Sequence, residues 1–146
     1  MFLPAHVAAG LIIGKLTGNY PLALAAAIVI DVDHIISYAK HGILFRPKDL
    51  MHTLTTRNDP WGDQRSILHN ALVFVLISFA TAIYDPTVGA TIFFGYGSHL
   101  FLDALDDADY FPFFPSKKWN VRGPIGYFSE TEMLFSAILF LVFLFV

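Results

Sequence analysis

Residues 21–37 read PLALAAAIVIDVDHIIS, an apolar run into which two aspartates and a histidine are set. A mostly apolar stretch of roughly 17 to 25 residues is long enough to cross a bilayer core as a helix. Pro21 suits the first position of such a helix. The run therefore predicts a transmembrane helix with ionisable side chains, which are costly in lipid unless they are paired, bind metal or serve a function.

Four more apolar stretches of similar length accompany this run. A short polar turn separates the first two stretches, and Asp85-Pro86 separates the third from the fourth, so each pair predicts a helical hairpin. The last stretch has 16 residues and is either a full span or an obliquely packed helix. The whole chain, residues 1–146, is expected to be one all-α domain, an integral membrane bundle of four to five transmembrane helices. The predicted spans cover residues 2–18, 21–37, 67–84, 87–105 and 131–146.

The amino-acid composition fits a membrane protein better than a soluble one. Hydrophobic residues make up 55% of the chain and charged residues 14%, whereas a soluble domain carries about 25% charged residues. The net charge of −3 is too small to suggest a nucleic-acid partner. No cysteine is present, so any metal ion must be held by histidine and carboxylate side chains.

Two local signals concern helix packing and a helix start. Gly10, Gly14 and Gly18 recur every four residues, which predicts a helix face that another helix can approach closely. Ser129, followed three residues later by Glu132, is typical of a capping box and predicts the start of the last helix.

Lysine and arginine are concentrated in two polar segments, residues 38–66 and 106–130. An up-and-down arrangement of helices places both segments on one side of the membrane. The positive-inside rule assigns that side, and the N-terminus, to the cytoplasm, so a multi-pass protein of the inner or plasma membrane is expected. Eight of the nine basic residues lie in these segments: Lys40, Arg46, Lys48, Arg57, Arg65, Lys117, Lys118 and Arg122.

Seven histidine and aspartate side chains fall inside the predicted spans. At about 1.5 Å per residue they lie roughly 15 to 24 Å from the outer helix ends, in one layer. Histidine and carboxylate groups bind Zn²⁺ or Mn²⁺ when no thiolate is available. Seven groups exceed one tetrahedral site, so more than one ion is expected, with metals on the order of 3.5 to 4 Å apart. The predicted ligands are His6, Asp31, Asp33, His34, His69, His99 and Asp103.

Other polar and aromatic residues have simpler interpretations. His41 and His52 are expected to be solvated loop side chains, and Asp106, Asp107 and Asp109 to form a solvated helix end. Taken singly, each intramembrane histidine or aspartate could also be a hydrogen-bonded packing residue. An interfacial aromatic belt is predicted from Phe111, Phe113, Phe114, Trp119, Tyr127 and Phe128.

The order of these groups resembles the YdjM/YbcI-type family of membrane-bound metal-dependent hydrolases. The resemblance implies an integral membrane protein with hydrolase activity. The same order is distantly similar to zinc-dependent phospholipase C and P1-type nucleases, an analogy that favours a phosphoester substrate. The matching elements are His6 followed by Gly10, the run Asp31-Val32-Asp33-His34, Arg65 four residues before His69, and the run from Gly97 to Asp103 that contains His99.

The leading hypothesis is a membrane-embedded metal-dependent hydrolase of an ester or phosphoester, acting on a lipid or lipid-linked phosphate. Asp33 is the expected proton acceptor for the attacking water, and Asp31 is the second candidate. Arg65 is expected either to bind a substrate phosphate or to anchor its helix among lipid headgroups. The residues expected to hold phosphate are Arg65, Lys117, Lys118 and Arg122.

Two other functions use the same residues. A transporter or channel for metal ions or protons also contains intramembrane histidine and aspartate, and a membrane adaptor can contain a structural metal. Transporter sites tend to lie at the midplane between repeats. The chain has no visible repeat and the outer half of each predicted helix is apolar, which favours the enzyme.

Overall fold

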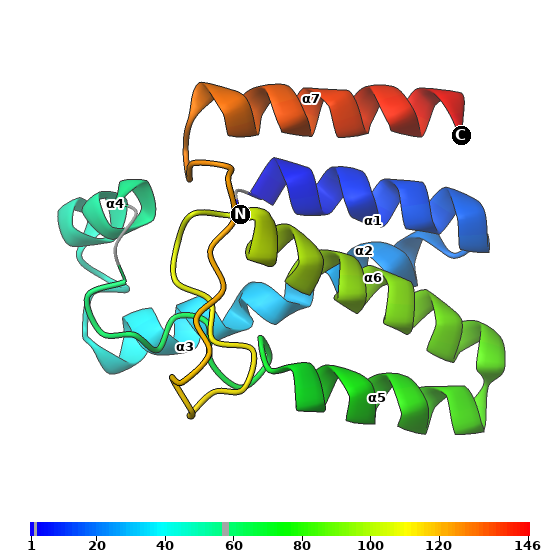
Figure 1. Ribbon diagram of the computed structural model, residues 1–146, viewed down its shortest axis with the longest axis horizontal. Helices are drawn as coiled ribbons and strands as arrows, with labels where there is room; N and C mark the ends of the chain where they lie inside the picture. Colours follow the sequence, from blue (N-terminus) through cyan, green and yellow to red (C-terminus); the bar gives the residue numbers. More distant parts are fainter. Residues whose placement is uncertain (2, 57–58) are drawn as a thin grey trace.

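The computed structural model describes residues 1, 3–56 and 59–146 (Figure 1). Phe2, where the first predicted span begins, and Arg57 lie outside the described residues. Across the described ranges the β-type pairings are two isolated bridges, so the all-α prediction is confirmed. The helices are α1 (Leu3–Thr17), α2 (Tyr20–Ile28), α3 (Val32–Lys40), α4 (Pro47–Thr55), α5 (Ala71–Tyr84), α6 (Pro86–Leu105) and α7 (Glu130–Phe145), with a 3₁₀ turn η1 (Val29–Asp31) between α2 and α3.

Helix α6 occupies the middle of the bundle. It packs against α1, α2 and α5, and α7 packs on the far side of α1 (Figure 1). Both predicted hairpins are present, α1 with α2 and α5 with α6. The bundle therefore brings three helices that carry predicted ligands, α1, α2–α3 and α6, into mutual contact.

Polar side chains start the helices where the sequence predicts. The Asp85 carboxylate accepts a hydrogen bond from the Thr87 amide at 2.8 Å at the start of α6. At the start of α7 the Ser129 hydroxyl accepts from the Glu132 amide at 3.3 Å, and Glu132 Oε2 accepts from the Phe128 amide at 2.6 Å. These bonds satisfy amide groups that a helix start leaves without an intrahelical partner.

Two of the three glycines in the predicted small-residue face lie in the α1–α2 contact. A β-carbon at Gly10 would lie 3.1 Å from Leu24 Cδ2, and one at Gly14 would lie 2.7 Å from the Tyr20 ring. Gly18 has another role, because it follows α1 with a φ of +74°. Close approach of α1 and α2 thus depends on the first two glycines.

Tyr20–Lys40 is, among the described residues, the one helical stretch that is long and apolar enough to cross a membrane. Helices α1 and α5 are shorter apolar helices. The chain is therefore mostly helical in the predicted regions, except that the predicted helix 67–84 begins only at Ala71 and leaves His69 in the turn before it. The number of four to five spans stays a prediction.

The 3₁₀ turn η1 interrupts this stretch beside α6. Because α2 ends at Ile28, the carbonyl of Ala27 is one of the last four of that helix, which generally lack an intrahelical donor. The backbones are close here, since a β-carbon at Gly95 of α6 would lie 2.8 Å from Ala26 Cβ. At this interruption the carbonyl oxygen of Ala27 lies 2.7 Å from Nδ1 of His99 on α6.

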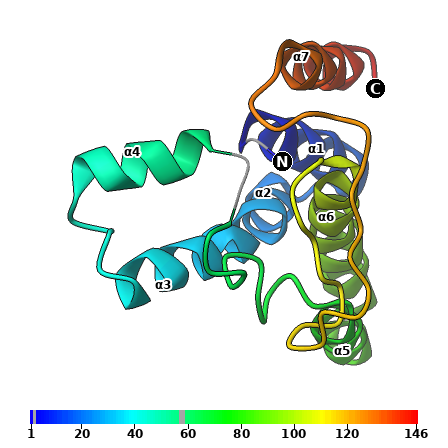
Figure 2. The same ribbon diagram turned by 60° about the vertical axis from the view of Figure 1, so that its left-hand side comes forward.

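The two segments predicted as polar loops are partly ordered. Segment 38–66 contains α4. This helix is seen nearly end-on in Figure 1, where α5, α6 and α7 are seen along their length. In Figure 2 it is α4 that is seen along its length, and the bundle helices are seen more nearly end-on. Helix α4 therefore lies across the bundle axes. Segment 106–130 folds against the end of α6, where the Gly123 amide donates to Asp106 O at 2.7 Å and the Ile125 amide to Leu105 O at 3.0 Å.

Candidate metal centre

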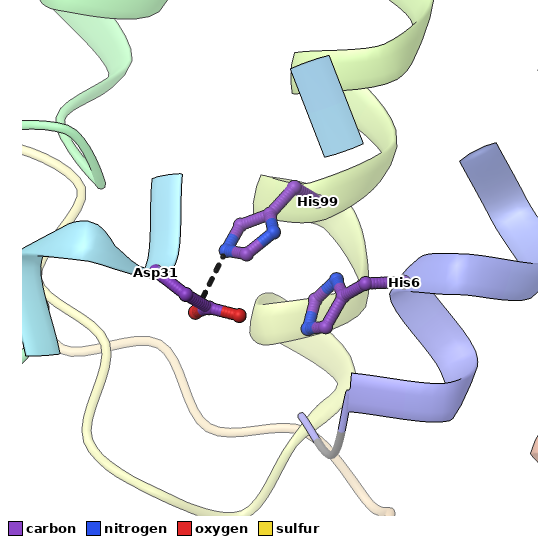
Figure 3. Close-up of side chains that lie close together, drawn as sticks. All are labelled: His6, Asp31 and His99. Carbon is purple, nitrogen blue, oxygen red and sulfur yellow. Dashed lines mark ion pairs between the residues drawn. The ribbon is translucent and has the colours of Figure 1, made fainter. Parts of the chain in front are cut away.

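Three chain segments far apart in sequence meet at His6, Asp31 and His99 (Figure 3). His6 comes from α1, Asp31 from η1 and His99 from α6. The two imidazole rings stack with their centroids 4.0 Å apart, and His99 Nε2 lies 3.6 Å from Asp31 Oδ1. One potential ligand atom from each residue lies within 4.8 Å of the other two, so the three could bind one metal ion.

Two further groups overlap with this one. Asp31, His34 and His69 form the second group, with His34 Nε2 3.4 Å from Asp31 Oδ1. His69, His99 and Asp103 form the third, with His69 Nε2 3.2 Å from Asp103 Oδ2. The structure thus brings together six of the seven predicted ligands in one cluster, which we call the His/Asp cluster: His6, Asp31, His34, His69, His99 and Asp103.

Asp33, the seventh predicted ligand, lies behind His69 and belongs to none of these groups. Its Oδ2 accepts hydrogen bonds from the backbone amides of Ser66 at 3.2 Å, Leu68 at 2.7 Å and His69 at 3.3 Å. The same oxygen lies 3.2 Å from His69 Nδ1. A carboxylate on the far ring nitrogen of a ligand histidine is the usual arrangement that orients the ring toward a metal.

His69 and His99 present two nitrogen lone pairs to each other. A carbonyl can only accept, so His99 Nδ1, 2.7 Å from Ala27 O, must carry the proton. The Asp33 carboxylate likewise accepts from His69 Nδ1. In the neutral rings both Nε2 atoms are then acceptors, yet they lie 3.2 Å apart. Two acceptors so close require a cation, a metal ion or a shared proton, to stabilise them.

Two buried atoms in the cluster make no hydrogen bond. They are His6 Nδ1 and Asp103 Oδ2, in side chains that are essentially inaccessible to solvent. Asp103 Oδ2 still has the positive charge of Arg65 Nε 3.1 Å away. A buried polar atom without a partner costs free energy, so His6 Nδ1 indicates a missing partner. Imidazole nitrogens and carboxylate oxygens form the donor set expected for Zn²⁺ or Mn²⁺, and the residues therefore fit a divalent metal site.

Arg65 is buried and its guanidinium is occupied by the protein itself. Its Nη2 lies 2.7 Å from Asp106 Oδ2 and its Nε lies 3.1 Å from Asp103 Oδ2. Its Nη1 donates at 3.4 Å to the carbonyls of Ala108 and Asp109. These contacts connect the predicted ligand Asp103 to the segment after α6, so they favour a positioning role over phosphate binding.

Asp106 belongs to the site, a role that the sequence did not predict. The predicted solvated helix end is wrong for this side chain, which is fully buried. Its Oδ2 lies 2.7 Å from both the Arg65 guanidinium and the amino group of Met1. Burial acts to raise the pKa of Asp106, but these two positive charges lower it below the ordinary value. Only the spacing of Arg65 and Asp106 in three dimensions, which the sequence does not give, reveals the pair.

The predicted phosphate-binding residues in segment 106–130 lie on the surface. Arg122 Nη2 pairs with Asp109 Oδ1 at 2.5 Å, and Lys117 Nζ lies 5.7 Å from the centre of the Phe111 ring. Lys118 is exposed. The contacts of Arg122 and Lys117 are thus with other loop residues and not with the His/Asp cluster.

The two loop histidines differ. His52 is exposed, as predicted. His41 is not freely solvated: it stacks on Trp61 with ring centroids 4.3 Å apart and lies 3.1 Å from Asp63 Oδ2. Asp63 also accepts from Lys40, and burial, which alone would raise its pKa, is outweighed by the hydrogen bonds, which lower the pKa to about 2.

The His/Asp cluster is open along one edge. The side chains of Asp31 and His34 are 31% and 25% exposed, whereas those of His6, His69 and His99 are fully buried. A water molecule or a substrate would therefore reach the cluster beside Asp31 and His34.

The comparisons with known proteins gave one match. A model of the protein family described as "YdjM inner membrane protein" matches residues 2–146. No curated protein and no solved structure matches the chain. The family match covers nearly the whole chain, including every residue of the His/Asp cluster.

Proposed function

Because the chain belongs to the YdjM inner membrane protein family, we propose that it is a multi-pass membrane hydrolase that uses divalent metal ions held by the His/Asp cluster. Its substrate is an ester or phosphoester, and its N-terminus and both polar segments face the cytoplasm. The observation that carries the proposal is the pair of imidazole Nε2 atoms of His69 and His99, 3.2 Å apart with no proton available from either neutral ring.

Carboxylates around this pair favour a metal ion over a shared proton. Asp31 Oδ1 lies 3.6 Å from His99 Nε2, and Asp103 Oδ2 lies 3.2 Å from His69 Nε2. These distances leave both carboxylates available to ligate an ion between the rings. Three overlapping groups of ligands agree with more than one Zn²⁺ or Mn²⁺.

The chemistry divides among the residues by position. A divalent ion would acidify a water molecule and stabilise negative charge on the attacked oxygen. Asp33 keeps the His69 ring oriented, and Arg65 with Asp106 holds the carboxylate of Asp103. Asp31 lies at the open edge of the cluster, so we assign it, ahead of Asp33, the task of taking the proton from the attacking water.

A lipid or lipid-linked phosphate is the substrate class that location favours. The open edge at Asp31 and His34 belongs to the same apolar stretch, Tyr20–Lys40, that is long enough to cross a membrane. The cluster lies in the half of this stretch that leads into the polar segment 38–66. This half of the stretch ends at the lipid headgroups, so the headgroup of a membrane substrate would approach the open edge from that side.

The alternative function is transport of metal ions or protons. A transport pathway needs polar groups on both sides of the central site. The sequence contains no Asp, Glu, His, Lys or Arg in residues 20–30, 71–84 or 86–98, and residues 7–18 contain one, Lys15. The other half of the bundle therefore holds few ionisable groups. This one-sided distribution supports the hydrolase.

A paired assay on the purified protein tests the two functions. Phospholipids and lipid-linked phosphates would be screened for hydrolysis in detergent with Zn²⁺ or Mn²⁺ added, and liposomes would be tested for uptake of the same ions. The hydrolase proposal expects ester or phosphoester cleavage that His99→Ala abolishes and His52→Ala leaves unchanged. Uptake of ions into the liposomes without cleavage of any ester would contradict the hydrolase proposal and support the transport function.

A further inference from the structure

We propose that α4 lies in the plane of the membrane surface, with its apolar face inserted at the boundary between lipid headgroups and acyl chains. This interaction surface is separate from the proposed hydrolysis and does not depend on it. The proposed partner is the lipid bilayer itself.

Helix α4 is amphipathic. At about 100° per residue, one half of its circumference is apolar and the other is polar. The apolar half is well exposed at Met51 and Leu54, with 59% and 38% of each residue accessible, and Phe45 just before the helix is 93% exposed. The apolar half holds Pro47, Leu50, Met51 and Leu54, and the polar half holds Lys48, Asp49, His52, Thr53 and Thr55.

The described residues cover this apolar face only in part, at the half-buried Leu50. No residue of α4 is buried. A helix of nine residues is too short to be stable in water by itself, so contact of its apolar face with another apolar phase must contribute to its stability.

The position of α4 in the fold indicates that the apolar phase in contact with its apolar face is the lipid bilayer. The apolar stretch Tyr20–Lys40 ends seven residues before α4 begins at Pro47, so α4 starts where the chain leaves the membrane. Helix α4 also lies across the bundle axes (Figure 2), and a helix across a membrane-spanning bundle runs along the membrane surface. Interfacial helices of this type bury their apolar face about 5–10 Å into the headgroup boundary.

Contacts at both ends hold α4 in this position. Before the helix, the amide groups of Ile43 and Leu44 donate to Tyr38 O at 3.0 and 3.3 Å. At its end, the Tyr127 hydroxyl donates to Leu54 O at 2.9 Å. Since Tyr38 belongs to α3 and Tyr127 to segment 106–130, α4 is attached to the bundle at the end where the basic residues are concentrated.

The absence of cysteine makes a direct test possible. Single cysteines at Met51 and Leu54, and at Lys48 and His52 as matched controls on the opposite face, would be labelled with bimane. The full-length protein would then be reconstituted into phosphatidylcholine–phosphatidylglycerol vesicles with lipids brominated near the headgroup. We expect the labels at Met51 and Leu54 to be blue-shifted and quenched by the brominated lipids at least about twofold more than the control labels.

Two results would overturn the proposal. Equal quenching of labels on both faces would mean that α4 is not oriented by the membrane. A blue shift at Met51 and Leu54 without quenching by lipid would mean that protein, such as a second copy of the chain, covers the face instead. Circular dichroism of each labelled variant would verify that the helix content is retained.

Discussion

The carboxylate of Asp33 lies 3.2 Å from Nδ1 of His69, on the opposite side of the ring from the His/Asp cluster. This contact makes Asp33 a positioning residue for His69, although its sequence context suggests a ligand or a base. Its position also fixes the loop before α5, through the amides of Ser66 and Leu68.

We expect Asp33→Asn to keep the fold but weaken metal binding by about 10- to 100-fold, the usual effect of losing a carboxylate behind a ligand histidine. An asparagine oxygen can still accept the backbone amides, but it carries no charge to hold the proton on His69 Nδ1. Competition with a fluorescent chelator measures the affinity. Unchanged metal affinity together with lost hydrolysis would instead make Asp33 the proton acceptor.

His69→Ala and His99→Ala should each lower metal affinity at least about tenfold, because each removes an Nε2 atom of the facing pair. His52→Ala is the matched control, since His52 is an exposed histidine of α4. Elemental analysis of the purified variants measures the metal content. Equal metal loss in all three variants would show adventitious histidine binding.

Arg65→Ala should destabilise the protein by up to roughly 3–5 kcal/mol, because among the described residues it leaves the Met1 amino group as the one cation that faces both buried carboxylates, Asp103 and Asp106. Arg65→Lys keeps the positive charge but loses the planar set of guanidinium N–H donors, so we expect a smaller loss of stability than for Arg65→Ala. Thermal unfolding in detergent measures both variants. If Arg65 binds a substrate phosphate instead, Arg65→Ala would raise KM and leave the unfolding temperature unchanged.

Stability should fall in acid as Asp63 is protonated. Its pKa is about 2 in the folded protein against an ordinary value of 3.8, so its ionised form stabilises the fold. This contribution is complete above pH of about 4 and is lost as the pH falls toward about 2. Thermal unfolding of Asp63→Asn across this range should show a smaller pH dependence than that of the unsubstituted protein. Identical slopes would mean that the contacts of Asp63 with Lys40 and His41 do not stabilise the fold.

Cysteines at Lys48 and Lys117 should be protected from an impermeant thiol reagent in intact cells and labelled after permeabilisation. Both side chains are exposed and lie in the basic segments that the positive-inside rule assigns to the cytoplasm. A cysteine at Tyr84, 93% exposed in the α5–α6 turn, should show the opposite pattern. Labelling of Lys48 and Lys117 cysteines from outside would reverse the proposed orientation.

The positions of the apolar helices and most of the cluster were predictable because they depend on local rules, whereas α4 was not predicted. Apolar length, turn residues and caps such as Asp85 are read directly along the chain, and the common depth of His6 and His99 follows from helix rise. His69 was expected inside a helix but lies in the turn before α5. The roles of Asp33 and Asp106 were not predictable. Each depends on which way a side chain points relative to a partner more than thirty residues away, and sequence spacing does not encode that direction.

The carbonyl that fixes the proton on His99 Nδ1 belongs to the main chain of Ala27, just before the 3₁₀ turn η1 begins at Val29. The tautomer of His99 therefore depends on the main chain at position 27 and not on its side chain, which is fully buried and lies beside Gly10 of α1. An insertion that extended α2 through this point would give the Ala27 carbonyl an intrahelical amide donor and remove the acceptor that holds the proton on His99 Nδ1. The site should thus be sensitive to changes in chain length between Ala27 and Asp31, whereas substitution at position 27 is limited by helix packing alone.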